Sequence, residues 1–335
     1  MTPPPPPPDL AVRPDADRPT DPPVLAGGRG GRGDQAFRVV ALLAGLVVLA
    51  ILALIAWSTT KEALPAFKDE GISFITKNDW VPNDGKYGAL GFIYGTVLAS
   101  VIALVLAVPV SVGIALFVNE AAPRFIRRPV VTVLDLLAAV PSVVYGLWGV
   151  LVFAPAVTGF YQHIADATSG VPVLGTIFGG PVSGRSFMTA GIILALMITP
   201  IVTSLSREVI ATVPNAQREA AYGMGATRWE MIRHSVLPWS RGGITGAVML
   251  GLGRAMGETI AVALVIGSAA NQITPHVFFP GDAMAAVIAN QFGEASGTHR
   301  SALIGLGVVL FAITILVNVA ARSIVGRFDR RTQGA

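Results

Sequence analysis

The stretch Arg218-Glu219-Ala220-Ala221-Tyr222-Gly223-Met224-Gly225-Ala226 decides the fold, because it predicts a short helix that stops inside a loop between two apolar segments. Pro214 suits the first turn of that helix, where a missing N–H leaves no bond unmade, and Gly225 suits its C-terminal stop. Thr227 and Glu230 have the capping-box spacing, in which each side chain bonds the backbone amide of the other residue. The sequence therefore predicts a helix-turn-helix between two membrane spans.

This helix-turn-helix also offers a surface to another protein. We expect the second helix to end at Leu237-Pro238. The small residues Ala220-Ala221 form a patch, flanked by Arg218 and Glu219, that another helix or a groove can approach closely. An ordinary amphipathic connector accounts for the same pattern, since helices with an N-terminal proline and a C-terminal glycine are common. Physical arguments alone leave both interpretations open.

The same residues carry a resemblance. Glu219-Ala220-Ala221, Gly225 and the closing Leu237-Pro238 resemble the EAA loop of bacterial ABC importer permeases, although Ser235 stands where that family usually has a hydrophobic residue. In that family the loop docks in a cleft of the cytoplasmic ATPase. The resemblance therefore implies ATPase coupling through Glu219, Ala220, Ala221 and Gly225, with Thr227 and Glu230 capping the coupling loop.

Composition places the chain in a membrane. It is 53% hydrophobic and only 13% charged, whereas a soluble globular protein carries about 25% charged residues. It has no cysteine, which excludes a disulfide framework and a thiolate metal site. The sequence pI of about 9.7 could suggest nucleic acid, but the basic residues lie in short loops beside apolar segments, where they orient a protein in the bilayer. We therefore expect no nucleic-acid partner.

The order of the segments predicts an all-α membrane protein with six transmembrane helices. Each apolar run is long enough to span, since crossing ~30 Å of hydrocarbon takes about 20 helical residues. The expected spans are 39–57, 95 to past 109, 130–153, 187–206, 242–266 and 301–321. The expected domains are a disordered Pro/Gly-rich tail (1–36), a permease domain (37–326) with an outer loop (58–86) and the EAA coupling loop (207–241), and a basic tail (327–335). The resemblance adds a MetI-like importer architecture with a cytoplasmic coupling helix.

Charge asymmetry predicts the orientation. With six spans, most arginines fall on one side, which the excess of positive charge in inward-facing loops marks as the cytoplasm. The four lysines, all between Lys61 and Lys86, oppose this, but their loop also holds five acids. We expect a multi-pass protein of the bacterial cytoplasmic (inner) membrane with both termini in the cytoplasm.

Two charges fall inside the predicted fifth span. Arg254 lies about 12 residues from Gly242, or ~18 Å along a helix, close to the bilayer midplane. A charge there costs roughly 2.5–3.5 kcal/mol, so such residues usually face a protein interior or a wet cavity. Glu258 follows one turn later. One interpretation is a structural ion pair; the other is a translocation pathway in which Arg254 meets an anion, since a guanidinium donates paired hydrogen bonds to phosphate oxygens.

These residues extend the resemblance to a particular importer. The chain from about residue 36 to 330 resembles the PstC permease subunits of the phosphate-specific ABC importer, more closely than their PstA sister subunits. The residues that carry this resemblance are Leu252-Gly253-Arg254-Ala255-Met256-Gly257-Glu258-Thr259, Ala139-Val140-Pro141-Ser142-Val143-Val144-Tyr145-Gly146, and Trp80-Val81-Pro82 before Gly95-Thr96. In that family charged residues of this span matter for phosphate passage, which the resemblance carries onto Arg254 and Glu258.

The energy for transport must come from another chain. A P-loop needs Gly-x4-Gly-Lys-Ser/Thr, and no lysine follows Lys86. We therefore expect no cofactor, no metal and no enzymatic activity in this chain, with ATP and Mg bound by a partner ATPase. The resemblance implies a PstA-like permease subunit, a PstB-like ATPase dimer, a PstS-like external phosphate-binding protein, inorganic phosphate and membrane lipid as partners.

Other functions remain as alternatives. The permease could serve another small anion. A proton-coupled anion carrier could use Glu258 as its relay and would need no ATPase. An intramembrane hydrolase is a weaker idea, because the four histidines are scattered and no His-Glu-x-x-His occurs.

Overall fold

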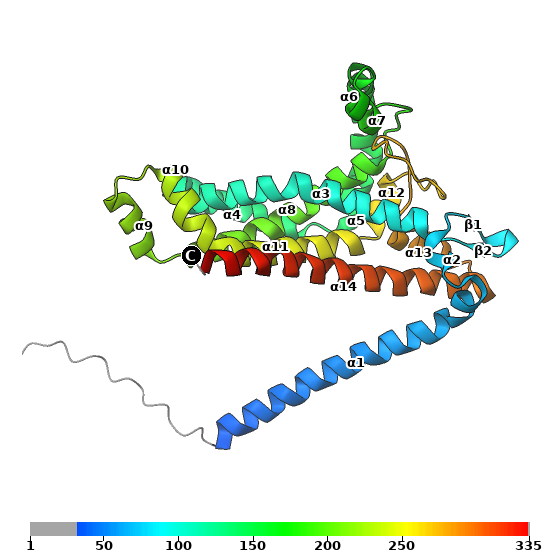
Figure 1. Cartoon of the computed structure of the whole chain (residues 1–335), viewed down its shortest axis with the longest axis horizontal. Helices are drawn as coiled ribbons and strands as arrows, with labels where there is room; N and C mark the ends of the chain where they lie inside the picture. The colour runs from blue at the N-terminus through cyan, green and yellow to red at the C-terminus, as the bar shows by residue number, and fades with distance from the viewer. Residues whose placement is uncertain (1–31, 334–335) are drawn as a thin grey trace, which may run out of the picture. The chain divides into compact units, whose positions relative to one another are not determined.

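The computed structural model describes residues 32–333, with side chains described for residues 33–323, and this part of the chain is almost entirely helical, as predicted (Figure 1). The elements in order are α1 (Arg32–Glu70), α2 (Ser73–Thr76), β1 (Trp80–Val81), η1 (Pro82–Asp84), β2 (Lys86–Tyr87), α3 (Leu90–Leu116), η2 (Phe117–Ala121), α4 (Arg124–Ala139), α5 (Ser142–Trp148), η3 (Gly149–Phe153), α6 (Ala154–Thr168), α7 (Pro172–Phe178), α8 (Phe187–Ala211), α9 (Asn215–Gly223), α10 (Arg228–Met231), η4 (Ile232–Val236), α11 (Leu237–Gly257), α12 (Ile260–Val265), α13 (Met284–Gln291) and α14 (Gly297–Gln333). The segments η2, η3 and η4 are π-helical. The chain divides into two units, Met1–Ile55 and Ala56–Ala335.

The predicted terminal tails lie mostly outside the described residues. Of the tail expected over 1–36, only residues 32–36 are described, and they already form the start of α1. Helix α1 therefore begins before the span expected from residue 39. Of the basic tail expected over 327–335, the backbone continues α14 as far as Gln333, while its side chains lie outside the described residues.

Helix α3 is built to pack closely along one side. Small residues recur at every fourth position, which places them on one face of a helix, and all of them are buried: Gly91, Gly95, Ala99, Ala103, Ala107, Ser111 and Ala115. Small residues let helix backbones approach each other, which is the usual way that helices associate in a membrane. The partner is α8, whose Thr199 carbonyl accepts a hydrogen bond from the Ser111 hydroxyl at 3.2 Å. The contact is so close that a Cβ on Gly191 of α8 would lie 2.4 Å from the Ile102 side chain of α3.

The α3–α8 pair lies at the centre of the second unit. Figure 1 shows α3, α8, α11 and α14 running alongside one another, with α9 and α10 at one end and the β1–β2 hairpin at the other. The main hydrophobic core contains Phe187 and Ile198 of α8, Val262 of α12, and three buried alanines of α3, Ala99, Ala103 and Ala107. A second cluster joins the hairpin residues Trp80 and Tyr87 to α13 and α14. We call the end of the second unit that carries α9 and α10 the α9 end, and the end that carries the β1–β2 hairpin the hairpin end.

Five helices of the described part are long and apolar enough to cross a membrane. They are Gly33–Glu70, Leu90–Ala121, Ser142–Thr168, Phe187–Ala211 and Gly297–Ser323. Their presence confirms an all-α membrane fold. The expected fifth span, 242–266, is not among them and is divided between α11 and α12. The expected third span, 130–153, contains a break at Val140-Pro141, as its sequence predicts, because the proline interrupts the helix there. Beyond the break the helical segments α5, η3 and α6 continue to Thr168, past the end expected at residue 153.

The loop expected over 58–86 also contains regular structure. Helix α1 continues through this region to Glu70, and a Glu70 carboxylate oxygen accepts a hydrogen bond from the Tyr87 backbone N–H at 3.1 Å. The hairpin then pairs Trp80 with Tyr87, whose rings meet edge to face with their centroids 5.2 Å apart. The Trp80 indole N–H donates to Gln291 of α13 at 3.1 Å. These polar and aromatic contacts attach the hairpin to the helices.

Candidate functional site

The predicted helix-turn-helix is present at the α9 end. Pro214 is the residue before the first helical position of α9, and Gly225 has the left-handed φ of +83° that stops the helix. The capping box is complete: the Thr227 N–H donates to the Glu230 carboxylate at 2.8 Å, and the Glu230 N–H donates to the Thr227 hydroxyl at 3.3 Å. The bond from the Thr227 backbone, helped by a second from its hydroxyl, holds the pKa of the Glu230 carboxyl below its usual value.

The prediction that Pro238 ends the second helix was wrong. Helix α10 continues through η4 into α11, and Pro238 lies in the first turn of α11. Pro238 has no N–H to donate and would interrupt the bonding pattern of a regular α-helix. The wider π-helical turn η4 directly before α11 changes that pattern, which lets the helical chain continue past the proline. The helix-turn-helix is therefore joined rigidly to α11, the helix that carries Arg254.

The residues of the EAA pattern do not all face outward. Glu219 and Ala220 are exposed, whereas Ala221 is buried at 6% exposure. Ala221 packs in a hydrophobic cluster with Ile210 of α8 and Met231 of α10. The prediction of a two-alanine surface patch is therefore half right: one alanine is available to a partner, and the other fixes α9 to the protein.

Sequence reasoning missed the largest apolar side chains of this surface. Tyr222, Met224 and Trp229 are 47%, 84% and 63% exposed. The sequence contained a signal for them, because these large apolar residues lie in the 207–241 loop between two expected spans, where lipid does not cover them. We call Glu219, Ala220, Tyr222, Met224 and Trp229 the coupling surface. It combines exposed apolar area with one carboxylate, as expected of a surface that another protein covers.

Arg218 does not flank the surface patch as expected. Its guanidinium turns inward and forms an ion pair with Glu120 at 2.9 Å, with the two side chains 17% and 8% exposed. It also donates to the backbone carbonyls of Ile210 and Val213. This side chain therefore binds to the permease body and is not available to a partner.

Arg254 and Glu258 lie where α11 ends, and the prediction that Glu258 follows Arg254 one turn later in the same helix was wrong. The helix stops at Gly257, Glu258 has an extended backbone, and α12 begins at Ile260. The Glu258 carboxylate instead accepts a hydrogen bond at 3.4 Å from the N–H of Ala261, which lies in the first turn of α12. No ion pair links Glu258 to Arg254 among the described side chains. The interpretation as a structural ion pair is therefore not supported.

Arg254 lies on an uncovered face of α11. The exposed or half-exposed positions of this face are Trp239, Gly246, Leu250, Gly253, Arg254 and Gly257. A Cβ added to Gly246, Gly253 or Gly257 would have no neighbour within 4 Å. Arg254 is exposed on this face. We call this set of residues the open α11 face.

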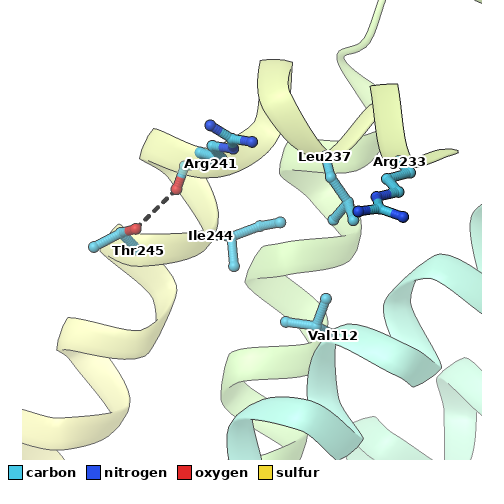
Figure 2. A pocket seen from close by; sticks show the side chains of 6 residues that line it. All are labelled: Val112, Arg233, Leu237, Arg241, Ile244 and Thr245. Atoms are coloured by element: carbon cyan, nitrogen blue, oxygen red, sulfur yellow. Dashed lines mark hydrogen bonds between the residues drawn. The ribbon is translucent and has the colours of Figure 1, made fainter. Parts of the chain in front are cut away.

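A groove on another side of α11 is separate from these residues. Its volume is about 320 Å³, and Figure 2 shows Arg233 and Arg241 near an apolar floor formed by Leu237, Ile244 and Val112 of α3. The Thr245 hydroxyl donates to the Arg241 carbonyl at 2.9 Å, within helix α11. Neither Arg254 nor Glu258 lines this groove, so it does not unite the residues predicted for the pathway.

The histidines do not form a site. His163 bonds a carbonyl of its own helix α6, His276 lies against Gly180, and His299 contacts Gln291. His234 is exposed in η4. No group of three or more metal-ligating side chains occurs among the described residues.

The fold belongs to a known class of membrane proteins. The chain is similar to a chain of a bacterial alginate ABC transporter solved in complex with an alginate-bound periplasmic protein, with a TM-score of 0.56 at 17% identity over 88% of this chain and 97% of that one. A second alginate transporter structure matches with a TM-score of 0.51 at 16% identity, over 88% of this chain and 98% of that one. This likeness shows that the chain shares its fold with a chain of each of these structures.

Residues 107–334 match the model of the binding-protein-dependent transport system inner membrane component family, and the chain belongs to that family. It is 46% identical over 267 residues to the phosphate transport system permease protein PstC of Xylella fastidiosa (strain Temecula1), covering 79% of this chain and 82% of that protein. PstC of Mesorhizobium japonicum is 46% identical over 81% of this chain and 82% of that protein. PstC 1 of Mycobacterium tuberculosis is 39% identical over 80% and 86%.

Family membership confirms the general predictions from the sequence. The protein is a multi-pass component of the inner membrane that works in a binding-protein-dependent transport system. It is a transport subunit rather than an enzyme.

Proposed function

We propose that this chain is the PstC-type permease subunit of an ATP-driven importer and forms half of the membrane pathway for inorganic phosphate. The observation that carries the proposal is the 46% identity, over most of both chains, to proteins named as phosphate transport permeases. The extent of this similarity favours a shared substrate as well as a shared fold.

The coupling surface supports an ATPase as the source of energy. Glu219 and the exposed Tyr222, Met224 and Trp229 project from one end of the protein, on a helix-turn-helix joined to α11. Closure of an ATPase dimer on this surface would move the helix-turn-helix and convert an outward-open pathway to an inward-open one. ATP and Mg would be bound by that ATPase, of the PstB type, and not by this chain.

The open α11 face supports a pathway shared with a second subunit. Its glycines allow another helix to approach closely, which suits a homologous permease subunit of the PstA type. The uncompensated guanidinium of Arg254 would meet phosphate there, because it can donate two parallel hydrogen bonds to phosphate oxygens. Glu258 would act by holding the start of α12 rather than by contacting phosphate, since its carboxylate accepts a hydrogen bond from the Ala261 N–H in the first turn of that helix.

The orientation and the remaining partners complete the proposal. The α9 end would face the cytoplasm, together with both termini, in agreement with the distribution of arginines. The hairpin end would then face outward, where a PstS-type phosphate-binding protein delivers the substrate. The surrounding bilayer contacts the outer helices.

Two alternatives have distinct signatures. A permease for another small anion would have the same ATPase dependence but would transport that anion in competition with phosphate. A proton-coupled carrier would transport without nucleotide and would stop when the proton gradient collapses.

The decisive experiment is purification in mild detergent, identification of the co-purifying chains, and phosphate uptake by the reconstituted complex. We expect uptake to require ATP and the ATPase and to survive collapse of the proton gradient. Glu219→Lys should leave the chain in the membrane but release the ATPase. Glu294→Lys, the same charge change at an exposed residue of the hairpin end, is the matched control. Phosphate accumulation by this chain alone, without nucleotide, would contradict the proposal.

A further inference from the structure

The side chain of Arg218 makes an unusually complete set of hydrogen bonds. Its Nε and Nη2 donate to Glu120 Oε1 at 3.3 and 2.9 Å. Nη2 also donates to the Ile210 carbonyl at 3.1 Å, and Nη1 donates to the Val213 carbonyl and to Asn215 Oδ1. A guanidinium has five N–H groups, so five bonds use its whole donor capacity.

The five bonds join three separate parts of the chain. Arg218 belongs to α9, Glu120 belongs to the π-helical end of α3, and the two carbonyls belong to the C-terminal end of α8 and the turn after it. The carbonyls at the end of a helix have no partner within it and carry partial negative charge, which favours a guanidinium. Arg218 therefore holds α9 against the ends of both central helices.

Residues next to Glu120 extend this connection. The Asn119 side-chain amide donates to the Arg207 carbonyl of α8 at 2.7 Å, and Arg127 of α4 donates to the Asn119 carbonyl at 3.1 Å. The π-helical turn η2 is thus hydrogen-bonded to α4, α8 and α9. We call Arg218, Glu120 and Asn119 the α9 junction.

The α9 junction differs in kind from the other attachment of α9. Ala221 holds the helix through apolar packing, which has no preferred direction and allows sliding. A fork of charge-assisted hydrogen bonds has a fixed geometry and resists both rotation and displacement. A force applied to the coupling surface, beginning at the next residue Glu219, would therefore reach α3 and α8 through Arg218.

We propose that the α9 junction is the mechanical link that converts movement of the coupling helix by the ATPase into movement of α3 and α8. This inference rests on the proposed function. It assigns Arg218 and Glu120 as positioning residues for coupling, distinct from the coupling surface that binds the ATPase. Breaking the junction leaves the ATPase bound and active but stops its work from reaching the pathway.

The test compares Glu120→Gln and Arg218→Gln in the purified complex. We measure the amount of ATPase bound, the rate of ATP hydrolysis, and the ratio of phosphate transported to ATP hydrolysed in proteoliposomes. Bound ATPase should stay at the wild-type amount, while the transport ratio should fall roughly tenfold, because a hydrogen bond to a charged group is typically worth about that factor. Glu208→Gln, at an exposed acid of α8, is the control and should keep the wild-type ratio.

Replacing the ion pair between Arg218 and Glu120 by a covalent cross-link tests whether these residues transmit movement or only stabilise the fold. The chain has no cysteine, so Glu120→Cys combined with Arg218→Cys provides a unique pair. Joining the two thiols with a short bis-methanethiosulfonate reagent should restore the transport ratio, and dithiothreitol should abolish it again. Failure of the linked variant to recover would overturn the proposal, as would a wild-type ratio in the single variants or loss of the ATPase from them.

Hydrogen exchange tests the α9 junction without measuring transport, so its result does not depend on the proposed function. Hydrogen exchange of the amides of residues 215–223 should be about tenfold faster in Glu120→Gln than in the wild type, since α9 loses its directional attachment. Unchanged exchange would contradict the α9 junction itself. Absence of ATPase from the wild-type complex would instead contradict the proposed function, before any variant is compared.

Discussion

Gly95→Ala tests whether the close approach between α3 and the loop before α13 is required. An ideal Cβ at Gly95 would lie 1.9 Å from the Asp282 carbonyl oxygen and 3.1 Å from the Phe187 ring. Ordinary contact begins at 3.4 Å, so the carbonyl would have to retreat by 3.4 − 1.9 = 1.5 Å. The loop cannot retreat freely, because the Met284 N–H donates to the Thr96 hydroxyl at 3.0 Å.

The free energy of unfolding should therefore fall. Overpacking typically costs 1–3 kcal/mol, and the loss of one hydrogen bond adds about 1 kcal/mol. Replacing glycine by alanine within a helix returns roughly 0.5–1 kcal/mol. We expect a net loss of about 1–3 kcal/mol, which lowers the melting temperature by several degrees at roughly 2–4 °C per kcal/mol.

Gly113→Ala is the matched control on the same helix. Gly113 is exposed, and a Cβ there would have no neighbour within 4 Å. The same substitution should therefore stabilise the protein by roughly 0.5–1 kcal/mol through helix propensity alone. Both variants are compared by thermal unfolding of the purified complex in detergent. The reasoning is wrong if Gly95→Ala melts at or above the wild-type temperature, or if the two substitutions shift it in the same direction.

Three further predictions concern other parts of the protein. Thr227→Ala removes the capping box and should destabilise the coupling segment by about 0.5–2 kcal/mol, seen as faster hydrogen exchange in residues 228–231; unchanged exchange would contradict it. Arg254→Gln should stop phosphate uptake without disturbing assembly, whereas Arg241→Gln, on another face of α11, should not; normal uptake by the first would remove Arg254 from the pathway. Asp282→Asn should stabilise the protein at neutral pH, because burial raises the pKa of the Asp282 carboxyl to about 6. The folded form then holds a proton that the unfolded form releases from about pH 4, so wild-type stability falls as pH rises from about 4 to 6 and is level above. The advantage of the Asn variant in melting temperature should disappear near pH 4, and an advantage independent of pH would refute the assignment.

Local rules were sufficient to predict the helix-turn-helix from the sequence. Gly225 at a left-handed position and the Thr227–Glu230 box both depend on residues within one turn of each other. The apolar spans were predictable for the same reason, since length and composition decide them. Features that depend on residues close together in the sequence were therefore predicted correctly.

Features that depend on distant residues were not predictable. Arg218 turns inward to meet Glu120, which is 98 positions away, and nothing near Arg218 indicates that partner. The break at Glu258 was missed because the carboxylate was assigned to Arg254, one turn back, while it actually bonds the Ala261 N–H ahead of it. Likewise, the π-helical turn that accommodates Pro238 has no simple sequence pattern. Sequence analysis therefore assigned the wrong contacts to Arg218 and Glu258 and the wrong helix end to Pro238.

The open α11 face has a consequence for how the subunit is made in the cell. If a PstA-type subunit covers this face as proposed, a copy synthesised in excess would present Arg254 and the exposed Leu250 to lipid, and an arginine at the bilayer centre costs roughly 2.5–3.5 kcal/mol. Such an orphan polypeptide should be recognised by membrane proteases and degraded. Its steady-state abundance is then set by the supply of its companion, which balances the stoichiometry of the two subunits without any dedicated regulator.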